Sequence, residues 1–300
     1  MGRLRRTMLY VPGNNPGMIR DAHIYGSDSI MLDLEDSISI KEKDAARMLV
    51  YQSLKTLDYG NTEVIVRVNG LNSPFGRDDF EAIARAKPDG IRLPKTETPE
   101  EVQEADELIT QIERQSGLEQ GTIKLIAAVE SALGVINAFR IATASKRLIG
   151  IAIGAEDFVT DMRTSRSADG IELLAARGQV LLAARAAGID ALDTVFSDIN
   201  DEEGFTREVK LIKQMGFDGK SIINPRQIDI VHRVFTPTNE EVGKASRIME
   251  AIREAEKKGL GVISLEGKMI DKPIVERAGR VLELYDAAAK NYALRGDRHA

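Results

Sequence analysis

The segment IKLIAAVESALGVINAFRIATASKRLIGIAIGAEDF, residues 123–158, contains two short aliphatic runs with a helical segment between them. The runs are IKLIAAV (Ile123–Val129) and LIGIAIG (Leu148–Gly154), and acidic residues follow both, Glu130 in the first case and Asp157 in the second. Continuous aliphatic runs of this length are typical of the buried strands of a parallel sheet. The segment therefore predicts strand, helix and strand, with carboxylates soon after both strands.

The same alternation extends over most of the chain. Apolar residues three and four positions apart mark the helical segments, for example PEEVQEADELITQIERQ (Pro99–Gln115), where Pro99 precedes an acidic first turn. The other strand-like runs are RTMLYV (Arg6–Val11), SIMLDL (Ser29–Leu34), EVIVRV (Glu63–Val68), GIRLP (Gly90–Pro94), ALDTVF (Ala191–Phe196) and KSIIN (Lys220–Asn224). Eight alternations predict an α/β fold, a closed parallel (β/α)8 TIM barrel rather than an open sheet.

The last part of the chain does not continue this alternation. Beyond Pro225 we expect a helix through EEVGKASRIMEAIREAEKKG (Glu240–Gly259), a glycine-rich crossing segment GLGVISLEGKM (Gly259–Met269) and a final helix from Pro273 to about Tyr292. This tail is too small to bury a core alone. The sequence therefore predicts a barrel over residues 1–224 and a C-terminal helical extension over residues 225–300 that packs on the barrel or on a neighbouring subunit.

The composition argues against several classes of protein. The net charge of −6 disfavours a nucleic-acid binder. The absence of cysteine excludes disulfide scaffolds, thiolate zinc sites and cysteine nucleophiles. Three scattered histidines, His23, His232 and His299, argue against histidine-centred catalysis. The apolar stretch before Pro12 is too short for a signal peptide and no membrane span follows, so we expect a cytoplasmic protein.

Acidic residues gather where the predicted strands end, and in a barrel of this kind these ends face the active-site mouth. Glu130 and Asp157 close successive strands, and because neighbouring strands lie roughly 4.8 Å apart, both carboxylates can converge on one point. Two hard oxygen ligands favour Mg²⁺, which completes its coordination with water and substrate oxygens. The alternative is that both acids are helix N-caps or solvated loop residues. The other polar residues at strand ends are Asp33, Glu35, Asp36, Asn69, Lys95, Glu156 and Asp198.

Arg67 lies inside the apolar run EVIVRVNG (Glu63–Gly70). An unpaired guanidinium at that position would be strongly unfavourable, so Arg67 must face anions. The anion is either a substrate carboxylate, which fits the guanidinium fork with two hydrogen bonds, or a protein carboxylate one strand away, Asp33 or Glu35. Both interpretations can hold, because an arginine oriented by protein carboxylates can still present donors to a substrate.

Gly154 and Ala155 stand just before the acidic pair Glu156 and Asp157. Small residues at a strand-to-helix turn let a ligand approach the backbone closely. We therefore expect the backbone N–H groups of Gly154 and Ala155 to contact a ligand carboxylate.

Several segments together resemble the HpcH/HpaI aldolase and citrate lyase family over nearly the whole chain. They are RTMLYVPGNNPGM, MLDLEDSI, VIVRVNG, IRLPKTET, LIAAVESALGV, IGIAIGAEDF, DTVFSDINDEEGF, GFDGKSIINPRQI and GVISLEGKMIDKPIVERA. The resemblance implies that Glu130 and Asp157 bind Mg²⁺ and that Arg67, with Glu130, contacts the substrate. It also implies cleavage of a citryl thioester to oxaloacetate and an acetyl thioester, in which Mg²⁺ stabilises the developing alkoxide and Arg67 binds a carboxylate.

The resemblance leaves three readings of the chain's role. The first is the lyase subunit of a citrate lyase complex, which forms a homo-oligomer, acts on a thioester carried by acyl carrier protein or coenzyme A, and has the alpha and gamma (acyl-carrier) subunits as partners. The second is a free-standing malyl- or citramalyl-coenzyme A lyase or thioesterase. The third is a non-catalytic structural subunit. The C-terminal stretch GLGVISLEGKMIDKPIVERA (residues 259–278) favours the first reading over the second.

Asp271, in the motif MIDKP, precedes the last predicted helix. The motif resembles one in related acyl-coenzyme A lyases, and the resemblance implies that Asp271 is the general acid or base at the enolate carbon, in its own active site or in that of a neighbouring subunit. The alternative is a helix N-cap, because Pro273 lies at the expected helix start.

Basic residues near the first two strands form a candidate docking surface for an acidic carrier protein or nucleotide. They are Arg3, Arg5, Arg6, Lys41 and Lys43. The alternative is that these charges are simply solvated.

Overall fold

The computed structural model describes residues 3–257, 263–265 and 268–296. The chain divides into two compact units. One spans Arg5–Val231, and the other comprises the described part of residues 232–300 together with Arg3 and Leu4. Within the described residues, no helix combines the length and apolar character needed to cross a bilayer.

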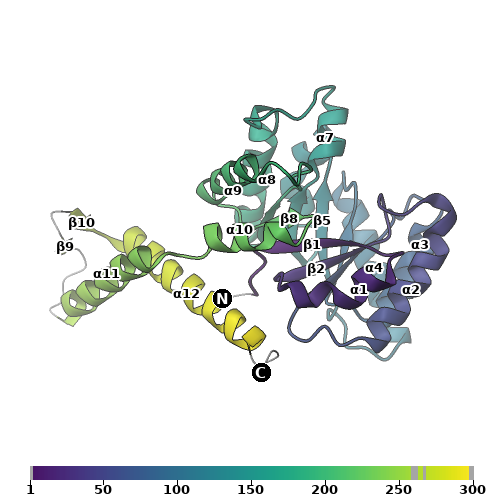
Figure 1. Cartoon of the computed structure of the whole chain (residues 1–300), viewed down its shortest axis with the longest axis horizontal. Helices are drawn as coiled ribbons and strands as arrows, with labels where there is room; N and C mark the ends of the chain where they lie inside the picture. The colour runs from purple at the N-terminus through teal and green to yellow at the C-terminus, as the bar shows by residue number, and fades with distance from the viewer. Residues whose placement is uncertain (1–2, 258–262, 266–267, 297–300) are drawn as a thin grey trace. The chain divides into compact units, whose positions relative to one another are not determined.

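The larger unit is a closed barrel of eight strands, all of which pair in parallel with their neighbours in chain order (Figure 1). The last strand pairs with the first, through Thr7↔Lys220, Met8↔Ser221 and Leu9↔Ile222. The predicted (β/α)8 fold is therefore confirmed. The strands are β1 (Thr7–Pro12), β2 (Ser29–Asp33), β3 (Glu63–Arg67), β4 (Gly90–Leu93), β5 (Lys124–Val129), β6 (Leu148–Ile153), β7 (Asp190–Asp193) and β8 (Gly219–Ile222).

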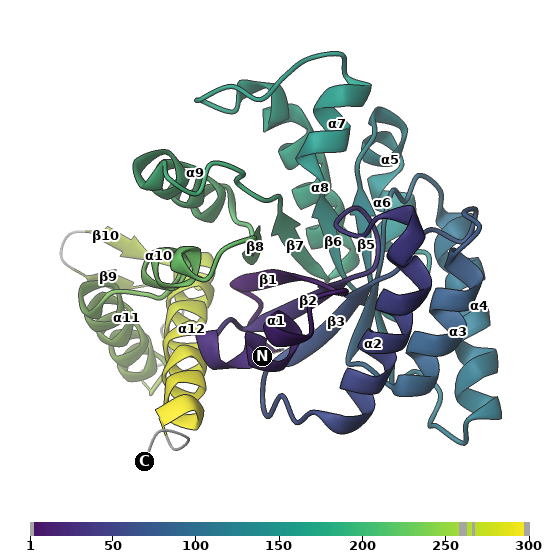
Figure 2. The same cartoon turned by 45° about the vertical axis from the view of Figure 1, so that its right-hand side comes forward.

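Helices surround the strands (Figure 2). They are α1 (Pro16–Asp21), α2 (Lys43–Thr56), α3 (Gly76–Ala86), α4 (Pro99–Gln115), α5 (Ala132–Ile136), α6 (Ala138–Ala142), α7 (Ala155–Asp161), α8 (Leu174–Ala187) and α9 (Glu202–Met215). Short 3-10 helices lie at Ala22–Tyr25, Ile40–Glu42 and Ile171–Leu173, and α10 (Arg226–Phe235) follows β8. Helix α4 begins as its sequence predicts, because Thr98 and Glu101 form a capping box around Pro99.

The barrel interior is apolar below its mouth. Inward side chains from six strands form one buried cluster: Met8, Met31, Ile65, Ile126, Ala152 and Leu192. This filling makes the interior a packed core rather than a pore, so a ligand can bind only above it, among the residues at the carboxyl ends of the strands.

The opposite, N-terminal end of the barrel is closed by ion pairs. Arg5 donates to Glu63 at 2.7 Å and to Asp190 at 2.7 Å. The buried Arg6 donates to Asp28 at 2.8 Å. The prediction that Arg5 and Arg6 form a docking surface is therefore wrong, because both guanidinium groups are committed to carboxylates from distant parts of the chain.

The same correction applies to Lys43. Its ammonium group is buried and donates to Asn69 Oδ1 at 2.8 Å and to the carbonyl oxygens of Leu34 at 2.8 Å and Glu35 at 2.7 Å. Lys43 therefore holds the loop after β2 and is not a docking residue. Arg3 and Lys41 are exposed, so docking stays a prediction for these two residues only.

Arg147 forms the densest of these N-terminal networks, just before β6. Its guanidinium group donates to Asp106 at 2.5 Å, to Glu113 at 2.6 Å and to the carbonyl oxygen of Ile123 at 3.0 Å. Burial alone would raise the pKa of Glu113, but hydrogen bonds from Arg147 and from backbone N–H groups outweigh it and lower that pKa. The network therefore ties α4 to the start of the barrel strands.

The smaller unit contains the two predicted C-terminal helices, α11 (Asn239–Lys257) and α12 (Lys272–Gly296), and a two-stranded antiparallel hairpin, β9 (Ile263–Leu265) with β10 (Lys268–Ile270). The described part of the predicted glycine-rich crossing segment forms this hairpin, and residues 259–262 and 266–267 lie outside the described residues. A small apolar cluster joins the elements through Ala245, Ile248, Ile270 and Ala278.

Candidate active site

A cavity of about 430 Å³ opens at the C-terminal mouth of the barrel. The five site residues predicted within the barrel all line it: Arg67, Glu130, Gly154, Ala155 and Asp157. Of the other predicted strand-end residues, Asp33, Asp36 and Glu156 also line this cavity. The fold therefore brings residues from β2, β3, β5 and β6 to one place, as a parallel barrel requires.

Glu130 and Asp157 lie in contact at this mouth. Glu130 directly follows β5 and is only 5% exposed, whereas the side chain of Asp157, in the first turn of α7, is 46% exposed. Burial raises the pKa of Glu130 to about 7, the nearby Arg92 opposes that rise, and the hydrogen bond with Asp157 adds to it. Two carboxyl groups in contact need a proton or a cation between them.

Gly154 makes room for Glu130. A Cβ atom at position 154 would lie 2.6 Å from Glu130 Cγ, far inside van der Waals contact. The N–H of Gly154 donates to Val129 O at 3.0 Å, and the N–H of Ala155 donates to Thr194 Oγ1 at 3.0 Å. Both residues line the cavity, but their N–H groups have partners within the chain, so the predicted contact with a ligand carboxylate stays a prediction.

Arg67 is held by protein carboxylates. Its Nε and Nη2 donate to the two oxygens of Asp33 at 2.7 and 2.8 Å, and Nη1 lies 2.9 Å from Glu35. Burial alone would raise the pKa of Asp33, but hydrogen bonds from Arg67 lower it below its usual value. Of the two interpretations of Arg67, the ion pair is present in the structure, and contact with a substrate stays a prediction.

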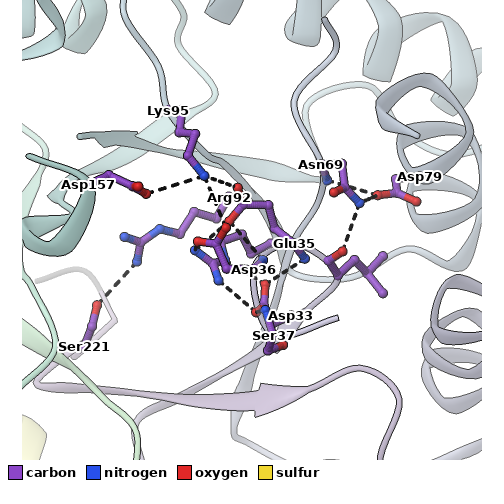
Figure 3. Close-up of polar contacts among 12 residues, drawn as sticks. Asp33, Glu35, Asp36, Ser37, Asn69, Asp79, Arg92, Lys95, Asp157 and Ser221 are labelled. Atoms are coloured by element: carbon purple, nitrogen blue, oxygen red, sulfur yellow. Dashed lines mark hydrogen bonds and ion pairs between the residues drawn. The ribbon is translucent and has the colours of Figure 1, made fainter. Parts of the chain in front are cut away.

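Lys95 connects the loops around the mouth (Figure 3). Its ammonium group pairs with Glu35, lies 3.3 Å from Asp36 and lies 3.4 Å from the metal-ligand candidate Asp157. The backbone of Lys95 has a positive φ of 45°, an uncommon conformation for a residue with a side chain. Lys95 therefore links the acidic loop after β2 to α7.

Glu35 and Lys95, described above, lie beside the cavity lining, and Asn69 and Asp198 also lie outside it. Asn69 donates from Nδ2 to Asp79 at 2.6 Å and to the carbonyl oxygen of Leu34 at 2.9 Å. Asp198 accepts a hydrogen bond from the N–H of Asn200 at 2.9 Å. These contacts order the loops that follow β3 and β7.

Asp271 lies in the other unit, at the start of α12. Its carboxylate accepts a hydrogen bond from the N–H of Ile274 at 3.3 Å. The alternative N-cap role is therefore present in the structure. The catalytic role of Asp271 stays a prediction.

The sequence interpretation missed Arg92 and Tyr10. Arg92 lies in β4, lines the cavity and is 2% exposed. The ring of Tyr10, from β1, lies under both cavity arginines, 5.0 Å from the Arg67 guanidinium carbon and 5.6 Å from that of Arg92. The signal for Arg92 was available, because GIRLP places a charge in an apolar run just as EVIVRV does.

The residues at the mouth fit a magnesium ion. Glu130 and Asp157 offer oxygen ligands only, from carboxyl groups already in contact, and open cavity lies beside them. Among the described residues, no group of three or more acidic or histidine side chains is arranged to hold a metal. The remaining coordination positions would therefore fall to water and substrate oxygens, as is usual for Mg²⁺.

A parallel barrel with two neighbouring carboxyl groups at its mouth has the arrangement of a barrel enzyme that uses a divalent metal. Within that class, the chain belongs to the HpcH/HpaI aldolase/citrate lyase family, whose sequence profile matches residues 6–225. The predicted family is confirmed, and the chain is a carbon–carbon lyase of that family.

Similar proteins support this assignment over at least 94% of the chain. The citrate lyase subunit beta of Leuconostoc mesenteroides subsp. cremoris is 57% identical over 285 residues, 95% of this chain and 94% of its own. The (3S)-malyl-CoA thioesterase of Cereibacter sphaeroides (strain ATCC 17025 / ATH 2.4.3) is 37% identical over 284 residues, 95% of each chain. The crystal structure of CitE from Mycobacterium tuberculosis with magnesium, acetoacetate and coenzyme A is 31% identical, with a TM-score of 0.78 over 94% of this chain and 98% of that one.

Proposed function

We propose that the chain cleaves a citryl thioester to oxaloacetate and an acetyl thioester, as the lyase subunit of a citrate lyase complex. One observation carries the proposal: Glu130, Asp157 and Arg67 line one cavity, in a chain 57% identical to a citrate lyase subunit beta over 95% of its length. The partners that follow are the alpha subunit, the gamma acyl-carrier subunit and further copies of this chain.

Glu130 and Asp157 would hold Mg²⁺. When bound, the ion supplies positive charge to the tertiary hydroxyl oxygen and the adjacent carboxylate of the substrate. Support comes from the contact between the two carboxyl groups and from the magnesium in the similar CitE structure. Arg67, oriented by Asp33 and Glu35, presents its guanidinium group at the edge of the same cavity.

The reaction needs two proton transfers. A base removes the proton of the tertiary hydroxyl group, the bond between the carbinol carbon and the methylene next to the thioester breaks, and the carbinol carbon becomes the ketone of oxaloacetate. The electron pair remains on the methylene as a thioester enolate, and an acid then protonates that carbon to give the acetyl thioester. Exclusion of water around the enolate would favour this sequence.

Asp271 is our candidate for the acid or base at the enolate carbon. Asp271 lies in the proposed C-terminal extension, residues 225–300, and the proposed catalytic barrel spans residues 1–224. The extension would pack on its own barrel or on that of a neighbouring subunit. Asp271→Asn keeps the N-cap, because Asn and Asp cap helices about equally well, and removes the titrating group. We expect kcat to fall about 10²- to 10⁴-fold at an unchanged melting temperature. A normal kcat in a stably folded variant would exclude this role.

A malyl-coenzyme A lyase or thioesterase is the second candidate, because a (3S)-malyl-CoA thioesterase is 37% identical over 95% of the chain. The two functions are separated by assaying the purified chain with Mg²⁺ on citryl, malyl and citramalyl thioesters of acyl carrier protein and of coenzyme A. We expect citryl thioester to release oxaloacetate. Activity confined to malyl or citramalyl thioesters would replace the proposed function with the second candidate.

A further inference from the structure

Arg92 is a buried cation at the floor of the cavity. It is the third residue of β4, is 2% exposed and lines the cavity. Its Nη1 reaches Ser221 Oγ, across the barrel on β8, at 3.4 Å (Figure 3). Its Nε has no hydrogen-bond partner within the described part of the chain. The guanidinium group therefore makes one long hydrogen bond to a neutral hydroxyl group and a cation–π contact with the ring of Tyr10.

Other buried arginines in the barrel differ from Arg92 in one respect. Arg6 pairs with Asp28, Arg147 pairs with Glu113 and Arg177 pairs with Asp193, each at 2.8 Å or less. Among the described residues, no carboxylate forms an ion pair with Arg92. Glu130 is close enough to interact electrostatically with Arg92 but forms no ion pair with it. A buried guanidinium without a direct carboxylate partner is unfavourable. Because Arg92 lines the cavity, a bound anion can pair with it directly.

Arg67 is less available than Arg92 to pair with a bound anion. Its Nε and Nη2 are taken by Asp33, and its Nη1 lies against Glu35 and Asp36. Of the two arginines that line the cavity, Arg92 is thus the one that no protein carboxylate pairs with directly. A planar guanidinium with a free Nε is suited to a carboxylate, which can accept two parallel hydrogen bonds.

The substrate of the proposed function carries two free carboxylates. One is attached to the carbinol carbon, beside the hydroxyl group that would face the metal. The other ends a CH2–COO⁻ arm, which a malyl thioester lacks. We propose that Arg92 binds the carboxylate of this arm and so selects a citryl thioester, and its product oxaloacetate, over compounds without the second carboxylate. This inference rests on the proposed function and deepens it.

The test compares two oxo acids that differ by this carboxylate. Binding of oxaloacetate and of pyruvate to the full chain with Mg²⁺ is measured by calorimetry for wild type, Arg92→Met and Arg92→Lys. Hydrogen bonds between charged groups correspond to an affinity change of about 10- to 100-fold. We expect the Kd of oxaloacetate to rise by that factor in Arg92→Met and by less in Arg92→Lys, while the Kd of pyruvate changes little. Equal losses for both acids would mean that Arg92 acts on the metal site and would overturn the proposal.

Thermal unfolding without ligand gives a second, independent readout. Removing an unpaired buried charge should leave the melting temperature of Arg92→Met equal to or above that of wild type, whereas Arg177→Met, which leaves Asp193 without this partner, should lower it. An Arg92→Met chain that fails to fold, or loses as much stability as Arg177→Met, would show that Arg92 is structural and would contradict the proposal.

The same experiments separate this inference from the proposed function. If wild type neither cleaves citryl thioester nor binds oxaloacetate, the proposed function fails and the role of Arg92 fails with it. If wild type does both and Arg92→Met binds oxaloacetate as tightly, only the inference about Arg92 fails.

Discussion

The two ends of the barrel differ in how completely their buried charges are paired within the chain. At the N-terminal end, each guanidinium described above meets a carboxylate, as Arg6 meets Asp28 at 2.8 Å and Arg147 meets Glu113 at 2.6 Å. At the mouth, the carboxyl group of Glu130 lies against another carboxyl group, and Arg92 has no carboxylate partner among the described residues. Paired groups at the N-terminal end have no need of a ligand, whereas groups without a direct partner at the mouth are available to bind one.

This difference separates stability from function within one domain. Breaking a buried pair leaves an isolated charge and is strongly destabilising. Removing a charged group that already lacks a direct partner does not leave an isolated charge behind. Such a substitution should therefore weaken ligand binding more than it weakens the fold. Substitutions at the N-terminal end should therefore change unfolding, and substitutions at the mouth should change binding and rate.

The largest effect is expected at the carboxylate pair. Glu130→Ala and Asp157→Ala each remove one of two metal ligands, and we expect kcat/KM for citryl thioester to fall by about 10⁴-fold or more, equivalent to about 5 kcal/mol. Steady-state kinetics and Mg²⁺ titration measure this effect, and both variants should still unfold cooperatively. Retention of more than a tenth of wild-type activity in either variant would remove that residue from the site.

Substitution of Arg147 should have a large effect on stability and little effect on activity. Arg147→Met leaves Glu113 and Asp106 without their cation, and we expect the free energy of unfolding to fall by about 3–5 kcal/mol. Urea unfolding measures it. At low temperature, where the variant remains folded, kcat should match wild type, because Arg147 lies at the far end of the strands from the cavity. A lower kcat in the folded variant would contradict the claim that the N-terminal end of the barrel contributes to stability and not to catalysis.

The contribution of Arg147 should depend on acidity. The folded-state pKa of Glu113 is below its ordinary value, so its ion pair stabilises the fold above the unfolded-state pKa of about 4.3. That stabilisation is lost as pH falls through the lower, folded-state pKa. The difference in unfolding free energy between wild type and Arg147→Met should therefore shrink as pH falls from 7 toward 3. A difference that stays constant over this range would exclude the ion pair as its source.

A smaller effect is expected at Arg67. Arg67→Lys keeps the positive charge but cannot reproduce the two parallel hydrogen bonds that a guanidinium group offers to a substrate carboxylate. We expect kcat/KM to fall about 100-fold, or about 3 kcal/mol, with folding preserved. Loss of folding would instead show that the ion pair with Asp33 is the main role of Arg67.

The fold could be predicted from the sequence because each strand is a separate aliphatic run. All eight predicted runs overlap an observed strand, and differences are confined to the ends, as in β7, where the strand ends at Asp193 and the rest of DTVF lies beyond it. A parallel barrel fixes where strand ends meet, so the sequence alone was enough to group Glu130, Asp157 and Arg67 at the barrel mouth, where all three line one cavity.

Pairing between distant residues could not be predicted. Arg5 pairs with Glu63 and Asp190, which are 58 and 185 positions away along the chain. The sequence does not show these partners, so Arg5 was wrongly predicted to be a docking residue. The role of Gly154 was also hidden, since only the structure shows that a side chain there would collide with Glu130. The charge of Arg92 was visible in GIRLP, but its lack of a partner is a property of the assembled barrel.

The most direct test of the account is the metal dependence of citryl thioester cleavage. The purified chain is treated with excess chelator, assayed for oxaloacetate release from a citryl thioester, and assayed again after excess Mg²⁺ is restored. We expect release to stop in chelator and to return with Mg²⁺, and we expect no return in Glu130→Ala. Full release in excess chelator would contradict the claim that the carboxylate pair at the barrel mouth works through a bound magnesium ion.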